Sequence, residues 1–225
     1  MSVERNLADI QQNIRQACES CDRSPEDISI IAVTKYVSIE RAKEALEAGI
    51  KDLGENRMKG FLDKFEAIGG DADWHFIGSL QSRKVKDIID HIHMLHSLDR
   101  KSLAKEIQKR ASKKIECFVQ VNVSGEESKH GVALDDAEAF IEALEAYDRI
   151  EVAGLMTMAP HIDDEEELRG VFRKLRALRD KVRDRSLPHA PCKYLSMGMS
   201  NDYVIAIEEG ATHIRIGTAL VGQES

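Results

Sequence analysis

Lys35 is the residue whose place in the sequence points most directly to chemistry. It belongs to a run, IIAVTKY at residues 30–36, that is apolar until Thr34. Apolar residues at consecutive positions predict a strand buried on both faces, as in a parallel sheet. Active-site groups of α/β folds gather where such strands end, and a lysine there can form a Schiff base with a carbonyl compound. The alternative is that Lys35 only extends its amine into water.

A second candidate site begins in SMGMSND, residues 196–202. A predicted strand ends there through Gly198, and Ser200 or Asn201 is a suitable N-cap for a following helix. Backbone N–H groups at the start of a helix favour a phosphate group. Phosphate sites in (β/α)8 barrels commonly form from the loops after strands seven and eight. We therefore expect a ligand site that uses residues from the last two predicted strands: Ser196, Gly198, Met199, Ser200, Arg215, Gly217 and Thr218.

A lysine after the first strand and a phosphate site after the last two predict a phosphorylated carbonyl ligand bound as a Schiff base. Two candidates follow, namely a phosphosugar in a lysine aldolase and pyridoxal 5′-phosphate (PLP). An aldolase needs an acid or base beside the lysine, and the nearest carboxylates at strand ends are Glu55 and Asp99. This favours PLP. The remaining strand ends are also polar or glycine and suggest a lined cavity: Asn56, His75 with Gly78, Ser97, Asn122 and Thr157.

Eight predicted strands alternate with helices along the chain. The strands are expected at residues 30–36, 52–56, 74–78, 94–98, 116–123, 151–158, 194–200 and 212–217. The intervening helices include 39–48, 101–109, 135–146, 163–185 and 203–208. This alternation predicts an α/β fold, a single (β/α)8 TIM barrel, rather than a doubly wound open sheet. We expect one domain over residues 1–225, with an extra N-terminal helix at about 2–22 and the barrel at about 28–222.

Composition narrows the class of protein. The chain has 225 residues, of which 42% are hydrophobic and 32% charged, as is ordinary for a soluble globular protein. A formal net charge of -8 argues against nucleic acid or an anionic membrane as the main partner. The N-terminal segment has no uninterrupted apolar core, so we expect no signal peptide and a cytoplasmic location.

Two clusters of possible metal ligands do not have the spacing that a metal site needs. Cys18 and Cys21 form a C-x-x-C pair without a second close pair and lie at the end of a predicted helix. His91, His93 and His96 span the end of a helix and the start of a strand, so they are not expected to converge. We predict no metal site.

Motifs spread over most of the chain resemble those of the pyridoxal phosphate homeostasis proteins, which are single barrels similar to the N-terminal domain of alanine racemases. The segments are AVTKY, GENR, WHFIGSLQSRK, NVSGEESKHGV, GLMTM, LSMGMSNDYVIAI and THIRIGTALVG. The resemblance implies a Schiff base between PLP and Lys35, and a phosphate site at Ser200, Gly217 and Thr218. It also implies that Arg215 faces the pyridine nitrogen and that Asn56 lies beside the ring. Arg83 and Ser79 depart from the family pattern after the third strand.

The resemblance implies a carrier more than a catalyst. Arginine stays protonated, so it donates to the pyridine nitrogen and leaves PLP a weak electron sink. Racemases of this type use a tyrosine from a second domain, and only Tyr36 and Tyr203 are candidates to replace it. We therefore expect a protein that buffers PLP and delivers it to PLP-dependent apo-enzymes. The alternatives are an amino-acid racemase and, from another class, a lysine aldolase. A monomer is expected, and a dimer stays open.

Two charged or polar segments have no assigned part in this function. Residues 163–167 are acidic and precede the cations Arg169, Arg173, Lys174, Arg176 and Arg179. This pattern is typical of a solvated helix whose charges match its dipole, with a docking surface for PLP enzymes as the alternative. Lys129, His130 and Gly131 follow the fifth strand, and we assign them no role.

Overall fold

The computed structural model describes residues 2–126, 129–160 and 164–223 and contains a closed parallel barrel. Eight strands neighbour one another in the order β4-β3-β2-β1-β9-β8-β7-β5, and β4 also pairs with β5, which closes the ring. The strands are β1 (Ser29–Val33), β2 (Asp52–Glu55), β3 (Asp73–Phe76), β4 (Met94–Leu98), β5 (Ile115–Asn122), β7 (Ile150–Met156), β8 (Tyr194–Met199) and β9 (His213–Ile216). The predicted (β/α)8 barrel is confirmed.

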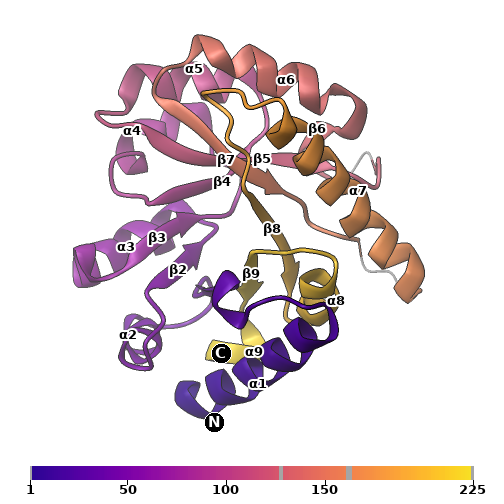
Figure 1. The fold of residues 1–225 in the computed structure, drawn as a ribbon. Coiled ribbons are helices and arrows are strands. Elements are labelled where there is room, and N and C mark those ends of the chain that lie inside the picture. Colours follow the sequence, from indigo (N-terminus) through magenta and orange to yellow (C-terminus); the bar gives the residue numbers. More distant parts are fainter. Residues whose placement is uncertain (1, 127–128, 161–163, 224–225) are drawn as a thin grey trace.

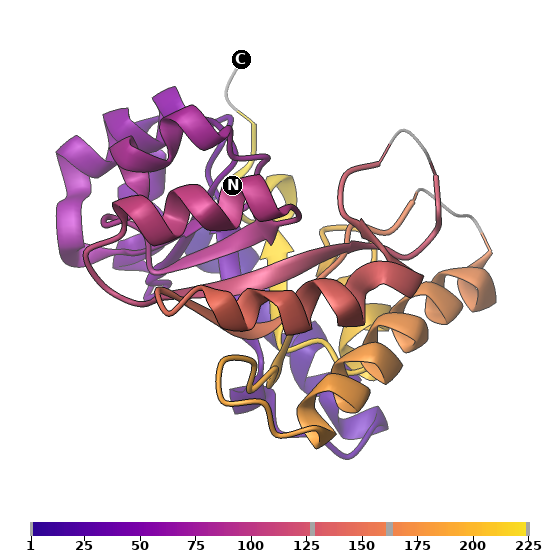
Figure 2. The same cartoon turned by 90° about the horizontal axis from the view of Figure 1, so that it is seen from above.

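The helices surround the barrel (Figure 1; Figure 2). They are α1 (Val3–Ser20), α2 (Ile39–Glu47), α3 (Met58–Ile68), α4 (Val85–Ile88), α5 (Lys101–Arg110), α6 (Ala137–Ala143), α7 (Glu165–Asp184), α8 (Tyr203–Glu208) and α9 (Thr218–Val221). Apolar side chains of the strands and of the inner helix faces form one large buried core. Such burial on both sides of each strand explains the continuous apolar runs in the sequence.

The extra N-terminal helix, α1, lies across the outside of the barrel against α8 and α9 (Figure 1). Its buried face follows the expected spacing of three and four residues, with Val3, Leu7, Ile10 and Ile14 all buried. The Asn13 side chain also donates a hydrogen bond of 2.8 Å to the Tyr203 hydroxyl on α8. The prediction of an additional first helix is confirmed, and that helix is fixed to the last part of the barrel.

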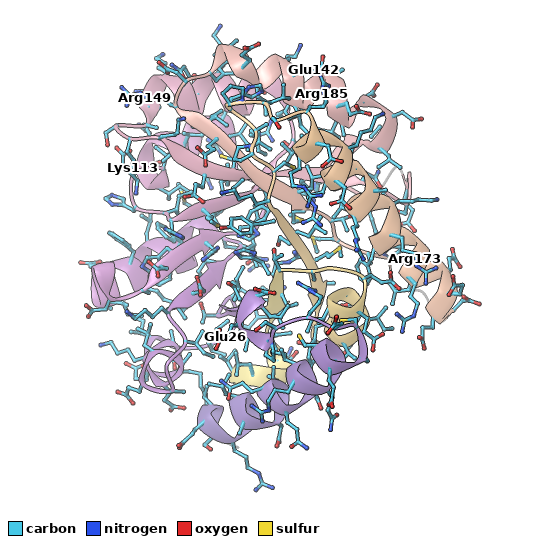
Figure 3. All side chains as sticks on the ribbon, viewed as in Figure 1. Glu26, Lys113, Glu142, Arg149, Arg173 and Arg185 are labelled. Atoms are coloured by element: carbon cyan, nitrogen blue, oxygen red, sulfur yellow. The ribbon has the colours of Figure 1, made fainter. Side chains whose placement is uncertain are left out.

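The long helix α7 begins with Asp164, whose side chain accepts a hydrogen bond from the Glu167 N–H at 2.9 Å. Asp163, where this helix was expected to begin, lies outside the described residues. Figure 3 shows Arg173 at the outer side of α7, where it pairs with Glu209, the residue that follows α8, across 3.1 Å. Arg169 pairs with Glu208 in the same way at 2.6 Å. These cations are therefore tied to α8, whereas the sequence pattern suggested only a solvated face.

Several predicted elements differ in extent from the observed ones, and one observed strand was not predicted. The first strand ends at Val33 instead of residue 36, because the chain turns immediately afterwards. The helix expected at 135–146 is α6 with a 3-10 turn at each end. A two-residue strand, β6 (Val132–Ala133), pairs with the end of β5 and had no sequence signal. In the described part of the chain, no helix has the length and apolar character that crossing a bilayer requires.

Candidate functional site

A cavity of about 540 Å³ lies beyond the carboxyl ends of the strands. Its walls come from the ends of β1, β2, β3, β5, β7, β8 and β9 and from the segments that follow them. Seven of the nine predicted cofactor residues line it: Lys35, Asn56, Met199, Ser200, Arg215, Gly217 and Thr218. The fold thus brings together residues from the beginning and the end of the sequence. Ser196 and Gly198 do not line this cavity.

Lys35 lies in a turn two residues beyond β1. The Val37 N–H donates to the Thr34 carbonyl at 3.2 Å, which closes the turn, and the Thr34 hydroxyl donates to Glu55 Oε1 at 2.6 Å. The Lys35 side chain is exposed, and its Nζ lies 4.7 Å from the centre of the Tyr36 ring. No ion pair to Lys35 is found within the described ranges. The backbone of the turn is therefore fixed, while the amine remains available to a ligand.

A buried ion pair supports this turn from below. Glu55 and Lys64 are almost fully buried, and their Oε1 and Nζ atoms are 2.9 Å apart. Glu55 thus accepts from both Thr34 and Lys64. Its carboxylate does not line the cavity, and neither does that of Asp99, which pairs with Arg100 at 2.6 Å. The two carboxylates that the sequence placed nearest to the lysine are therefore outside the cavity.

Asn56 is positioned by a close approach of two chain segments. A Cβ atom on Gly78 would lie 2.2 Å from the Asn56 carbonyl oxygen, so only glycine fits there. The Oδ1 atom of Asn56 is buried and has no hydrogen-bond partner among the described residues. Buried polar atoms are normally paired, so this cavity-lining oxygen is suited to accept a hydrogen bond from a ligand.

Arg215 is the buried cation of the site. Its Nη1 donates to Ser196 Oγ at 2.6 Å and its Nη2 to the Thr157 carbonyl at 2.9 Å. Burial lowers the pKa of Arg215 to about 10, and the charge of nearby Asp202 opposes this shift. The guanidinium therefore remains protonated at neutral pH. Since it has five N–H donors, donors remain for a ligand in the cavity.

Two short turns, which follow β8 and β9, form another part of the cavity wall. In the 199–202 turn, the Asp202 carboxylate accepts from the Met199 N–H, and the Asp202 N–H donates to the Met199 carbonyl at 3.1 Å. The N-cap of α8 is Asp202, so the prediction of Ser200 or Asn201 as the cap is wrong. The reason is that the Asp202 hydrogen bonds close the turn before the helix begins. Ser200 and Asn201 are thereby left on the cavity wall, which Gly217 and Thr218 after the neighbouring strand β9 also line.

Ser196 and Gly198 occupy structural positions next to the cavity. Ser196 is fully buried in β8, where its hydroxyl contacts Arg215. Gly198 has a φ of +93°, and a Cβ there would lie 2.6 Å from that of Ala206 in α8. The strand can therefore approach α8 only with glycine at this position. A direct contact of either residue with a ligand stays a prediction.

Four other predicted strand ends do not reach the cavity. His75 is buried with its ring in the barrel interior, Ser97 is buried outside the cavity, and Thr157 donates to the Val121 carbonyl at 2.9 Å. Asn122 is held by the loop after β5, where its side chain donates to the Glu126 carbonyl at 2.9 Å. Alternation along a strand explains these differences, since a shift of one residue reverses the direction of a side chain.

The three histidines considered as a metal cluster differ in their solvent exposure. His91 and His93 are exposed, whereas His96 is fully buried. Among residues 2–126, 129–160 and 164–223, no group of three or more His, Cys, Asp or Glu side chains is arranged to hold a metal ion. Cys18 and Cys21 are both free thiols whose pKa values are raised, chiefly by burial.

Sequence reasoning gave no site role to several residues of the cavity wall, among them the polar residues Gln120, His130 and Asp202. Gln120 could have been found, because it lies two residues before Asn122 near the end of the fifth strand. His130 belongs to the loop to which no role was assigned, and its carbonyl lies 3.4 Å from Gln120 Nε2. Ser79 also lines the cavity, whereas Arg83 is exposed outside it and contacts Gln81.

Comparison with known proteins supports the same picture. The family model "Alanine racemase, N-terminal domain" matches residues 6–225. The pyridoxal phosphate homeostasis protein of Aquifex aeolicus is 42% identical, with 99% of each chain covered. The chain belongs to the pyridoxal phosphate homeostasis protein family.

Solved structures agree with this family. PipY of Synechococcus elongatus PCC7942, solved with PLP bound, is 28% identical with a TM-score of 0.84, covering 98% of this chain and 100% of PipY. An alanine racemase from Corynebacterium glutamicum has a TM-score of 0.76 at 17% identity, covering 99% of this chain and 61% of the racemase. That likeness concerns the fold alone. This chain thus corresponds to about 61% of the racemase, the part that forms the barrel.

Proposed function

We propose that this chain binds PLP in the cavity through a Schiff base to Lys35 and takes part in PLP homeostasis. The observation that carries the proposal is the convergence of a lysine, a buried arginine and two turns on one cavity. A member of the same structural group, PipY, is solved with PLP bound. When bound, PLP supplies a reactive aldehyde and an electron-withdrawing ring.

The cavity residues fit the chemical groups of PLP. The exposed Lys35 amine is free to react with an aldehyde, and the protonated Arg215 can donate to a pyridine nitrogen. Asn56 Oδ1, buried without a partner in the described residues, can accept a hydrogen bond from a ring hydroxyl. Ser200 and Thr218 supply hydroxyl donors from the turns that follow the neighbouring strands β8 and β9, as a phosphate group requires. Each polar group of the ligand thus has a complementary residue.

The same residues favour holding PLP over converting an amino acid. Arg215 would donate a hydrogen bond to the pyridine nitrogen and would keep its own proton, so it would not strengthen the electron sink. Tyr203 cannot act as a base in the cavity, because its hydroxyl accepts from Asn13 on the outer helix α1. Tyr36 does line the cavity, but it belongs to the same turn as Lys35. An amino-acid racemase that uses Tyr36 is therefore the second candidate function.

A lysine aldolase has less support. Glu55 accepts a hydrogen bond from Thr34 and forms an ion pair with Lys64, and Asp99 forms an ion pair with Arg100. Asp202 is a carboxylate on the cavity wall, and it accepts the Met199 N–H that closes the turn before α8. A carboxylate that is held by this hydrogen bond is poorly suited to exchange protons with a sugar substrate.

Borohydride reduction followed by peptide mass mapping tests the proposal. After incubation with PLP, we expect a phosphopyridoxyl group on Lys35 in the wild type and none at this position in Lys35→Ala. Lys129→Ala removes another lysine beside the cavity, whose Nζ contacts the Met158 carbonyl at 3.3 Å, and should leave the adduct unchanged. Failure to find an adduct on Lys35 in the wild type would sink the proposal.

Racemisation and transfer assays then separate the candidate functions. Racemisation of a free amino acid that disappears in both Lys35→Ala and Tyr36→Phe would favour the racemase. Reactivation of a PLP-dependent apo-enzyme by the loaded protein, with released PLP trapped by a carbonyl reagent, would favour delivery. Light scattering of the loaded protein would determine whether it is the expected monomer or a dimer.

A further inference from the structure

A continuous row of polar side chains crosses the barrel interior from one end to the other. Asp52 Oδ1 lies 2.8 Å from His75 Nε2, and His75 Nδ1 lies 2.9 Å from His96 Nε2. His96 Nδ1 lies 2.8 Å from Ser196 Oγ, which accepts from Arg215 Nη1 at 2.6 Å. The five residues belong to five different strands, so only the closed barrel brings them into contact. We call these five residues the polar relay.

The two ends of the polar relay lie in different environments. Asp52 is the first residue of β2, and its side chain is 32% exposed, so it reaches water at the amino-terminal end of the barrel. His75, His96 and Ser196 are buried. Arg215 lies at the floor of the cavity at the opposite end. The relay therefore links an anion in contact with solvent to the buried cation of the site.

The order of donors and acceptors follows from the chemistry of the groups. Arginine can only donate, so Ser196 Oγ accepts from Arg215. The Ser196 hydroxyl hydrogen needs an acceptor, and among the described residues His96 Nδ1 is the one within reach. His96 then carries its hydrogen on Nε2 and donates to His75 Nδ1. His75 in turn donates from Nε2 to the Asp52 carboxylate. Every hydrogen of the row points from the cation towards the anion.

The surroundings of the histidines agree with this order. Burial lowers the pKa of His96 well below its usual range, and neighbouring His75, His213 and Arg215 lower it further. Burial alone would raise the pKa of Asp52, but the hydrogen bond with His75 and the charge interactions with His75, His213 and His93 together outweigh burial, so the net direction is down. His213 and the exposed His93 are the other titratable groups that face these rings. His96 is therefore neutral and Asp52 ionised at neutral pH.

We propose that Asp52, His75, His96 and Ser196 are positioning residues that hold Arg215 in place and stabilise its charge from the far end of the barrel. Hydrogen bonds aligned in one direction polarise one another, so Ser196 Oγ becomes a stronger acceptor for the guanidinium. A buried cation needs such compensation, because removal from water is costly. This inference deepens the proposed function, since Arg215 is the residue expected to face the PLP ring, but its first tests need no PLP.

The direction of the relay can be measured in the wild-type protein without ligand. Long-range proton–nitrogen NMR spectra distinguish the two ring nitrogens of each histidine. We expect both His75 and His96 to carry a hydrogen on Nε2 and none on Nδ1. A hydrogen on His96 Nδ1, or a doubly protonated His75, would reverse the order and overturn the proposal. The outcome is independent of whether Lys35 forms an adduct.

The coupling to Arg215 is tested with two variants of equal charge. Asp52→Asn removes the anion of the relay, whereas Asp73→Asn removes an exposed carboxylate that lies beside Asp52 in the register of β2 and β3. We expect the guanidinium hydrogens of Arg215 to exchange with water about tenfold faster in Asp52→Asn, the equivalent of one weakened hydrogen bond to a charged group. Asp73→Asn should leave the exchange rate unchanged. Equal rates in the two variants would overturn the coupling.

A third variant keeps the test decisive if Asp52→Asn does not fold. Ser196→Ala removes one oxygen atom and interrupts the relay next to Arg215. We expect the same acceleration of Arg215 exchange and a change in the tautomer of His96, whose Nδ1 loses its donor. A Ser196→Ala protein with an unchanged His96 tautomer and unchanged exchange would also refute the relay. In the loaded protein, the absorption band of bound PLP should shift in Asp52→Asn and not in Asp73→Asn.

Discussion

The cavity at the open end of the barrel and the row of polar residues in its interior differ in whether their polar side chains have partners within the protein. At the cavity, Lys35 Nζ has no ion pair within the described ranges, and Asn56 Oδ1 has no hydrogen-bond partner there. In the interior, His75, His96 and Ser196 form a continuous row of contacts of 2.8 to 2.9 Å. Both regions draw on β2, β3, β8 and β9, at positions only a few residues apart along each strand.

This difference indicates that binding and stability depend on different residues. A polar atom left without a protein partner gives up stability and gains the capacity to bind a ligand. A paired polar atom in the interior cannot bind a ligand, but breaking its contact is costly. Substitutions of unpaired polar side chains at the cavity should therefore change binding with little effect on folding, whereas substitutions of paired polar side chains below it should mainly change stability.

The largest loss of stability is expected from Lys64→Met, below the turn that carries Lys35. The variant leaves the Glu55 carboxylate buried without its counter-ion, and such losses cost about 3–5 kcal/mol. The matched control is Lys59→Met on the same helix, because Lys59 is exposed and pairs with Asp63 at the surface. Urea unfolding measures both. A Lys64→Met protein as stable as the control would show that the buried pair does not support the turn.

A smaller but still large loss is expected from Gly78→Ala. The added Cβ would lie 2.2 Å from the Asn56 carbonyl, so the backbone must move, at a cost of about 3 kcal/mol. Gly70→Ala is the control, since a Cβ there meets nothing within 4 Å. Thermal and urea unfolding would report the difference. Gly78→Ala should also weaken PLP binding, which would show that the backbone under the cavity is as closely packed as the interior.

Acidification should destabilise the interior before it affects the cavity residues. Burial lowers the pKa of His213 to about 3, so the unfolded chain takes up the proton first as the pH falls below about 6.5. The free energy of unfolding is therefore highest above that pH. It decreases by about 2 kcal/mol per buried neutral histidine between pH 7 and about pH 5.

His213→Asn tests this origin of the pH dependence. The amide keeps a polar atom near Thr212, which His213 Nδ1 contacts at 2.9 Å. The loss of stability between pH 7 and about pH 5 should become smaller by about 2 kcal/mol than in the wild type. His91→Asn, at an exposed histidine, should leave the loss unchanged. An unchanged pH dependence in His213→Asn would mean that His213 is not buried in its neutral form.

The smallest effect on folding is expected at the most important residue of the cavity. Lys35→Met replaces an exposed side chain that makes no ion pair in the described part of the chain, so the free energy of unfolding should change by less than about 0.5 kcal/mol. Covalent PLP binding should nevertheless be abolished. Urea unfolding and borohydride reduction measure the two effects. A large loss of stability in Lys35→Met would contradict the separation between cavity and interior.

The sequence predicted the barrel because its signals are local. Continuous apolar runs, alternating helices and polar strand ends can be recognised within a few residues, and they located Lys35, Asn56, Arg215 and Thr218. The end of β1 was placed three residues too late, since Thr34 and Tyr36 are good strand residues. Only the contact of Thr34 with Glu55 explains why the chain turns there.

The polar relay could not be predicted, because it depends on distances across the barrel. His75 and His96 come from neighbouring strands, but Ser196 is a hundred positions beyond His96 in the sequence. Which residues meet inside a barrel depends on strand tilt and register, which no local pattern reveals. For the same reason, His75 was expected at the cavity and lies below it.

The pairing of β1 with β9 has a consequence for protein synthesis. Lys35 follows the first strand, and Arg215 lies in the last, so the cavity is complete only after almost the entire described chain has left the ribosome. At 5–20 residues per second, the interval between these two residues is about 10–40 s. During that time Lys35 lacks Arg215 and the turns that follow β8 and β9, so it should not retain PLP. Cofactor loading is thus expected to be a post-translational event.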